Sequence, residues 1–254
     1  MQITILAESA PQAQDRDFDI MAPIETATMK RRDFLITSAA LAASSVSGSP
    51  ADAPTAVAKP PVGEWQSMFD GVSLRGWRET AFTGPGKVSV EKGTIVLGRG
   101  MMTGITWTNP FPRFNYEVRL EAVRLEGSDF FAGITFPVKN AYCSWINGGW
   151  GGSVVGLSSL NGLDASENES STTMDFEKGR WYRLRLRVTD ERIQAWIDDE
   201  LYIDVALEGR EISLRWGEIE LSAPFGVATY ATTGALRKLE YRLLEPPATG
   251  AKRQ

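Results

Sequence analysis

The residues of this sequence that could carry out chemistry gather between positions 140 and 170. The segment combines carboxylates with indole side chains: Asp164, Glu167, Glu169, Trp145 and Trp150. Two carboxylates that face one cleft at a separation of about 5 to 10 Å can serve as general acid and general base on a glycosidic bond. Tryptophan faces stack on the C–H faces of sugar rings. The segment therefore predicts a site for a neutral carbohydrate.

The same segment supplies hydrogen-bonding groups and unusual backbone freedom. Tyr142, Asn147 and Asn168 are expected to bind sugar hydroxyls. A Gly-Gly pair on each side of Trp150 predicts a loop, because glycine lets the backbone approach a ligand closely. We therefore expect Trp145 and Trp150 to form a platform for the sugar. The alternative is that both are core aromatics of a β-sandwich, where large aromatic side chains usually lie.

The carboxylates have competing interpretations. Asp129 precedes a strand that carries Gly133 and either points into a cleft or is a plain turn residue. Asp164, Glu167 and Asn168 could ligate calcium, although their spacing matches no known calcium loop. A solvated polar loop is the remaining interpretation. We expect no other metal ion and no organic cofactor.

Composition excludes several classes of protein. The chain of 254 residues contains no histidine, which rules out a Ser-His-Asp triad and imidazole-ligated zinc within one chain. Cys143 is the single cysteine, so no intrachain disulfide forms; without a histidine to activate it, we expect a buried packing residue. A net charge of −5 gives no basic face for nucleic acid. Acid–base chemistry must use Asp, Glu, Tyr, Lys or a bound ion.

Near the N-terminus, a basic, an apolar and a small-residue stretch follow one another in the order that is typical of an export signal. Residues 29–53 begin with a basic stretch, continue with a mildly apolar run over 34–46 and end in small residues. The run is shorter than the roughly 20 residues that span a bilayer, so no membrane span is expected. Arg31-Arg32 resembles a twin-arginine signal, which predicts the twin-arginine export machinery as a partner and a periplasmic or extracellular location.

The other boundaries follow from composition. Residues 1–28 are interpreted as an upstream extension, from either an early start codon or a long signal N-region. Residues 54–63 form a Pro/Ala linker, residues 64–246 the folded domain, and residues 247–254 a tail.

Strands must position the candidate site. Apolar and polar residues alternate over residues 116–121, 183–188, 193–197 and 238–243, and turn signals recur between such segments. This pattern predicts an all-β jelly-roll sandwich of two antiparallel sheets. Arginines at 180, 183, 185 and 187 are expected to form a solvent-facing row that pairs with neighbouring acids rather than a binding site. The tryptophans outside the 140–170 segment are expected to pack in the core or at sheet edges.

Three stretches carry a resemblance to a known family. They are the opening Trp65–Trp77, the hairpin Val88–Ile95 and the hairpin Gly179–Asp199. Together they resemble the 3-keto-disaccharide hydrolases over residues 64–245. The resemblance implies a concanavalin A-like sandwich, export and cleavage of glycosidic bonds in 3-keto sugars.

The central motifs depart from that family. In Phe131–Pro137 the expected Asn and Arg are replaced and only Gly133 is retained. In Ala141–Asn147 the expected carboxylates are missing, and Cys143 stands where the family has Glu.

Two functions from different classes remain open. The first is an exported hydrolase or lyase that cleaves 3-keto-glycosides, with an acid or base from Asp129, Asp164, Glu167 or Glu169. The second is a non-catalytic glycan-binding module of the cell envelope; a structural envelope module without a pocket is a third. Convergence of two carboxylates beside tryptophans in one pocket would favour the enzyme, and a shallow aromatic face would favour the binding module.

Overall fold

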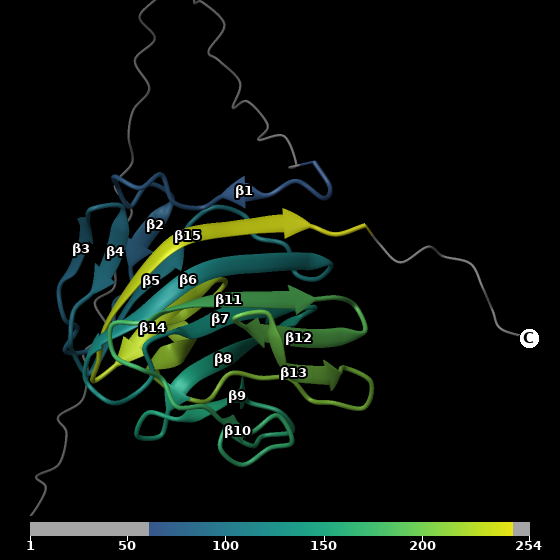
Figure 1. The fold of residues 1–254 in the computed structure, drawn as a ribbon. Helices are drawn as coiled ribbons and strands as arrows, with labels where there is room; N and C mark the ends of the chain where they lie inside the picture. Colours follow the sequence, from purple (N-terminus) through teal and green to yellow (C-terminus); the bar gives the residue numbers. More distant parts are fainter. Residues whose placement is uncertain (1–60, 246–254) are drawn as a thin grey trace, which may run out of the picture. The chain divides into compact units, whose positions relative to one another are not determined.

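The computed structural model describes residues 61–245, which form a sandwich of two antiparallel sheets (Figure 1). The eight-stranded sheet contains β1 (Gln66–Ser67), β3 (Val88–Glu91), β4 (Thr94–Leu97), β6 (Tyr116–Glu126), β11 (Trp181–Val188), β12 (Arg192–Ile197), β13 (Glu200–Ala206) and β15 (Thr233–Leu243). The seven-stranded sheet contains β2 (Trp77–Glu79), β5 (Met102–Trp107), β7 (Gly133–Val138), β8 (Ala141–Gly149), β9 (Val154–Ser158), β10 (Thr172–Thr173) and β14 (Gly226–Tyr230). The predicted all-β sandwich is confirmed.

Some of the predicted boundaries lie outside the described residues. These are the extension 1–28, the signal 29–53, the first part of the 54–63 linker and the tail 247–254. Within residues 61–245, no helix has the length and apolar character needed to cross a membrane.

The eight-stranded sheet forms where the sequence alternates. In β11, Leu184 and Leu186 point into the core, while the arginines between them point outward. Arg187 lies opposite Glu117 of β6, and its Nε donates to a Glu117 carboxylate oxygen at 2.7 Å. The prediction of a paired, solvent-facing arginine row is therefore confirmed.

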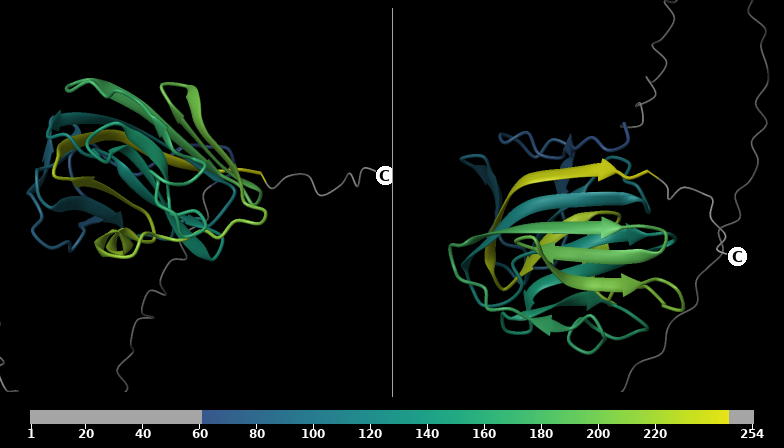
Figure 2. Two further views of the ribbon diagram at one scale, coloured as in Figure 1. Left: turned by 90° about the horizontal axis from the view of Figure 1, so that it is seen from below. Right: turned by 45° about the vertical axis from the view of Figure 1, so that its right-hand side comes forward.

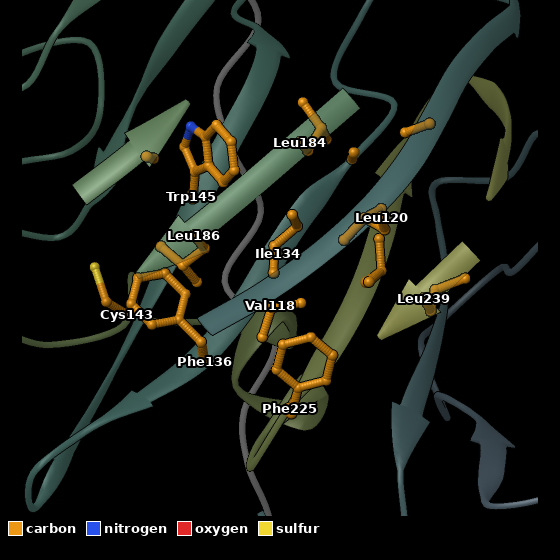
Figure 3. Packing of buried hydrophobic residues seen from close by; sticks show 14 of the residues in the cluster. Val118, Leu120, Ile134, Phe136, Cys143, Trp145, Leu184, Leu186, Phe225 and Leu239 are labelled. Carbon is orange, nitrogen blue, oxygen red and sulfur yellow. The ribbon is translucent and has the colours of Figure 1, made fainter. Parts of the chain in front are cut away.

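The core lies between the sheets, and both contribute to it (Figure 3). Val118 and Leu186 of the eight-stranded sheet meet Ile134 and Phe136 of the seven-stranded sheet. Each such side chain, when fully buried, contributes about 1.5 to 3 kcal/mol through removal of apolar surface from water. Cys143 is buried among them, and burial raises the pKa of its thiol to about 12. It is thus the packing residue that the sequence predicts.

The outer face of the seven-stranded sheet carries small side chains. One row crosses five strands in register, from β5 through β14, β7 and β8 to β9: Thr106, Gly226, Thr135, Ser144 and Ser158. Residues 208–225, which we call the strap, connect β13 to β14 and include the 3₁₀ helix η1 (Glu218–Ser222). In the left view of Figure 2, η1 lies along the lower side of the sandwich. The small side chains leave room for the strap to cover this face.

Candidate functional site

A cavity of about 360 Å³ lies between the outer face of the seven-stranded sheet and the strap. Its lining comes from strands β5, β8, β9 and β14, from the loops that follow β6 and β8, and from the strap: Met102, Asp129, Phe130, Ser144, Ile146, Trp150, Ser158, Arg215, Trp216, Glu218, Ile219 and Tyr230. Ser144 of β8 and Ser158 of β9 form part of the floor, and their small side chains leave the space open. Segments far apart in the sequence therefore meet in one hollow.

Three aromatic side chains present exposed surface around this cavity. Trp150 is 42% exposed, and Trp216 is 91% exposed. Tyr230 stacks on Phe130 with ring centroids 5.9 Å apart and an interplanar angle of 26°. Open indole faces beside polar groups are suited to sugar rings, which offer flat C–H surfaces and hydroxyls.

Two carboxylates, Asp129 and Glu218, line the same cavity. Asp129 accepts hydrogen bonds from the backbone N–H of Phe130 at 2.8 Å and of Gly151 at 3.1 Å. Both oxygens of Glu218 lie 3.0 Å from the backbone nitrogen of Thr83. None of the ion pairs formed among residues 61–245 includes either carboxylate. Both groups therefore keep lone pairs for a ligand or a proton.

Asp164 supports the cavity wall from outside. Its Oδ1 accepts from the hydroxyls of Ser158 and Ser159 at 3.2 and 3.3 Å, and its Oδ2 lies 3.4 Å from Nε of Arg215. The Arg215 guanidinium in turn lies 5.9 Å from the ring of Trp150. Asp164 is thus connected to the cavity through Arg215 and Ser158 but is not part of its lining.

Trp145 and Asn147 differ from expectation. Both side chains point from β8 into the sandwich and have no exposed surface. Nδ2 of Asn147 donates to the carbonyl of Ala132 at 2.9 Å. The expectation that they contact a sugar is wrong for this structure, because alternation along β8 assigns Ser144 and Ile146 to the outer face instead. Trp145 is the core aromatic of the alternative interpretation.

The remaining predicted residues lie away from the cavity lining. Glu169 pairs with Nε of Arg210 at 2.5 Å, and Glu167 is exposed. Asn168 is buried, and its Nδ2 donates to the carbonyls of Leu157, Leu163 and Asp164, so it holds its own loop together. The Tyr142 hydroxyl accepts from Nη1 of Arg113 at 3.1 Å. Of the nine predicted residues, the structure brings Asp129 and Trp150 together in one cavity.

The side chains that were expected to ligate calcium, Asp164, Glu167 and Asn168, do not converge on one point. Among residues 61–245, no group of three or more His, Cys, Asp or Glu side chains converges as metal ligands would. The oxygens of Asp164 face Ser158, Ser159 and Arg215, and Oδ1 of Asn168 accepts from Ser170.

Sequence reasoning missed the strap. Arg215, Trp216 and Glu218 reach the cavity from a segment without alternation, and Tyr230 reaches it from the end of β14. The expectation that every tryptophan outside residues 140–170 packs in the core or at a sheet edge is wrong for Trp216. A usable signal was present, since Trp216-Gly217 is an aromatic residue in a turn-forming stretch without apolar periodicity.

Residues 64–229 match the family described as the 3-keto-alpha-glucoside-1,2-lyase-like domain, over more than half of the chain. The protein belongs to this family. The match confirms the resemblance carried by Trp65–Trp77 and the two hairpins, and it assigns the chain to a carbohydrate-active family. No curated protein matches the sequence.

Several solved structures are similar to the chain. The carbohydrate-binding module CBM66 from Bacillus subtilis shares 14% identity at a TM-score of 0.42, covering 66% of this chain and 95% of that one. Domain 4 of AbnA, a GH43 extracellular arabinanase from Geobacillus stearothermophilus, in complex with arabinotriose, shares 13% sequence identity at a TM-score of 0.46. The match covers 72% of this chain and 92% of that one. A protein of unknown function with a galectin-like fold from Bacillus subtilis shares 8% sequence identity at a TM-score of 0.49. The match covers 74% of this chain and 99% of that one. The family assignment rests on the sequence match.

Proposed function

We propose that the protein is an exported enzyme that cleaves the glycosidic bond of 3-keto-glycosides in the cavity beneath the strap. One observation carries the proposal: Asp129 and Glu218 line the same cavity as the exposed rings of Trp150 and Trp216. The carboxylates supply proton transfer, and the rings supply a surface on which a sugar can be oriented. Family membership supports the choice of 3-keto sugars.

The chemistry needs two groups that move protons and does not need histidine. A keto group at C3 acidifies the C2–H bond, so one carboxylate removes this proton while the C1–O bond breaks and a C1=C2 double bond forms. The second residue, as a carboxylic acid, gives its proton to the departing oxygen. Addition of water across the double bond then yields the free 3-keto sugar. Asp129 and Glu218 share these two roles, and exchange of the C2 proton distinguishes them.

The full chain is tested on 3-keto-disaccharides and their unoxidised parents, with and without calcium, with products followed by mass spectrometry. We expect cleavage of the oxidised sugars. Asp129→Asn and Glu218→Gln should each lower turnover by about 10²- to 10⁴-fold. In D₂O, the variant that lacks the base should also lose deuterium incorporation at C2, whereas the variant that lacks the acid should retain it.

Glu220→Gln is the matched control, because Glu220 lies in the same 3₁₀ helix as Glu218 and is exposed outside the cavity lining. It should leave turnover unchanged. Wild-type cleavage that survives both cavity substitutions would show that the reaction takes place elsewhere on the protein.

The second candidate is a glycan-binding module without catalysis. The observation that favours it is the exposure of Trp216 beside Trp150, which offers a stacking surface that needs no proton transfer. This function predicts no turnover, together with sugar-dependent quenching of tryptophan fluorescence that disappears in Trp150→Ala.

Export is proposed on the Arg31-Arg32 pair and the apolar run that follows it. The expected location is the periplasm or the outside of the cell. Replacing both arginines by lysine in a host with a working twin-arginine pathway should retain the protein in the cytoplasm. Unchanged secretion would contradict this route.

A further inference from the structure

The loop that carries Trp150 has an unusual backbone. We call residues 148–152 the Trp150 loop. Trp150 has φ of 48°, in the left-handed region that bulky residues rarely adopt. Gly148, Gly151 and Gly152 also have positive φ, at 77°, 90° and 124°. A loop with this backbone needs partners that hold its peptide groups in place.

Arg124 of β6 holds both ends of this loop. Its Nη2 donates to the carbonyl of Gly148 at 3.1 Å and to the carbonyl of Gly152 at 2.8 Å. One guanidinium group therefore fixes the points at which the chain enters and leaves the turn. On the far side, Gly151 N–H donates to Oδ2 of Asp129, so the loop is held between Arg124 and a cavity carboxylate.

The surroundings of Arg124 are unusual for a charged residue. It is 5% exposed, and its guanidinium lies 5.2 Å from the ring of Phe131 and 5.7 Å from that of Phe176. Burial lowers its pKa, although a guanidinium remains protonated in proteins. Arg124 takes part in no ion pair among residues 61–245. A buried arginine without a paired acid is rare, and the hydrogen bonds of its guanidinium go to the Trp150 loop.

The loop sequence is matched to this arginine. A Cβ atom on Gly148 would lie 2.2 Å from Nη2 of Arg124, and one on Gly152 would lie 3.4 Å from its Nη1. At Gly148 the positive φ favours glycine, and a Cβ atom would displace the guanidinium of Arg124. Gly148, and to a lesser degree Gly152, thus leave room for the guanidinium.

We infer that Arg124 is the positioning residue of the carbohydrate site. It holds the Trp150 loop so that the indole lines the cavity and Gly151 N–H meets Asp129, and it does not itself line the cavity. The expected effect of Arg124 on sugar binding rests on the proposed function. Its expected effect on the conformation of the Trp150 loop does not. With 3-keto-disaccharides, Arg124→Lys should lower kcat/KM roughly tenfold, mainly through KM, since a displaced indole weakens binding.

A spectroscopic test needs no ligand. The full chain is labelled with 5-fluorotryptophan, which gives one ¹⁹F signal for each of its 8 tryptophans, and Trp150→Phe assigns the Trp150 signal. Arg124→Lys removes the planar guanidinium and with it Nη2, the atom that donates to both carbonyls. We therefore expect the Trp150 signal to shift or broaden while the signals of core residues such as Trp145 stay in place.

Arg113→Lys is the matched control. Arg113 also donates to backbone carbonyls, those of Lys139 and Ala141, and it lies outside the cavity lining. This substitution should leave the Trp150 signal unchanged. Gly148→Ala is the second test, because it keeps Arg124 and displaces its guanidinium; it should move the same signal.

The inference is overturned if the Trp150 signal is unchanged in folded Arg124→Lys and Gly148→Ala. If the signal moves as expected while no 3-keto-glycoside is cleaved or bound, the positioning role stands and the proposed function fails. The two outcomes are therefore separable.

Discussion

The two outer faces of the sandwich use carboxylates in opposite ways. On the eight-stranded sheet, acids are paired with cations. Glu117 has no exposed side-chain surface and contacts Arg185, Arg187 and Arg242, while Glu121 contacts Arg237 and Lys238. On the seven-stranded sheet, the acids of the cavity accept from backbone N–H groups. The first arrangement uses the acids for stability, and the second leaves them available for chemistry.

The tryptophans follow the same division. On the eight-stranded face, arginine guanidiniums lie over Trp65, Trp181 and Trp196 at 4.1, 4.0 and 3.8 Å from the ring centroids. Trp150 and Trp216 beside the cavity keep exposed surface. A guanidinium that lies against an indole occupies the face on which a sugar ring could stack; Arg215 lies farther from Trp150, at 5.9 Å from its ring centroid. Contact partners, rather than residue type, therefore distinguish the charged outer face of the eight-stranded sheet from the face proposed to bind sugar.

The largest effect on stability is expected from Glu117→Gln, which removes the charge shared by three arginines. Loss of one partner of a buried ion pair destabilises proteins strongly. Because the three arginines are about one-third exposed, water compensates part of the loss, and we expect about 2 to 3 kcal/mol. Urea unfolding measures this difference.

Glu240→Gln is the control, since its pair with Arg119 is more exposed and should contribute less than about 1 kcal/mol. Equal losses for the two variants would contradict the special role of Glu117.

The same carboxylate predicts how stability depends on pH. Burial alone would raise the pKa of Glu117, but hydrogen bonds and positive charge from Arg242 and Arg187 outweigh it, so the pKa lies below its ordinary value of 4.5. Such a group stabilises the fold above the unfolded-state pKa, and this contribution is lost as pH falls through the folded-state pKa. Wild-type stability should therefore fall steeply below about pH 5, and more steeply than that of Glu117→Gln. Parallel pH profiles of the two proteins would exclude Glu117 as the cause.

A smaller effect is expected on the opposite face, where small residues admit the strap. A Cβ on Gly226 would lie 2.7 Å from the carbonyl oxygen of Ser222 and 2.8 Å from that of Ile105, so Gly226→Ala should destabilise by about 1 to 2 kcal/mol. A Cβ on Gly133 would lie 3.0 Å from its nearest neighbour, an atom of the Phe130 ring, and that side chain can move. Gly133→Ala should therefore have less than half the effect. Thermal unfolding of both variants checks this order.

The smallest effect on stability is expected from Trp216→Ala. Its side chain is 91% exposed, so the free energy of unfolding should change by less than about 0.5 kcal/mol. Sugar affinity should nevertheless fall, by about 1 kcal/mol for the loss of one stacked aromatic ring. Fluorescence titration measures the binding. A destabilised variant, or one with unchanged affinity, would show that the indole serves another purpose.

The sequence predicts the outer face of the eight-stranded sheet better than it predicts the cavity on the seven-stranded sheet. In β6 and β11 one face meets the core and the other carries charged side chains that pair with one another, so apolar and charged residues alternate visibly over residues 116–121 and 183–188. In β8, Cys143–Gly149 is buried on both faces because the strap covers the outer one. Alternation between polar and apolar residues is then absent, and Trp145 cannot be told from an outward residue.

Other parts of the cavity depend on contacts between distant segments. Asp129 and Trp150 belong to the loops that follow β6 and β8, and Glu218 reaches them from the strap. The spacing of these three residues in the sequence does not predict that they line one cavity, because they come together only where the strap crosses the sheet. Asp129 and Trp150 were accessible to prediction because loop glycines accompany them.

The strap supplies one third of the cavity lining from outside the two sheets. Ser213 exchanges backbone hydrogen bonds with Ser159 at one end, and the carbonyl of Phe225 accepts from Trp107 N–H at the other. Between these anchors, residues 214–224 contribute Arg215, Trp216 and Glu218 without belonging to either sheet. If the cavity binds sugar as proposed, we expect substitutions in this stretch to change the sugar preference while the two sheets stay unchanged. Grafting this stretch between members of the family would test that expectation directly.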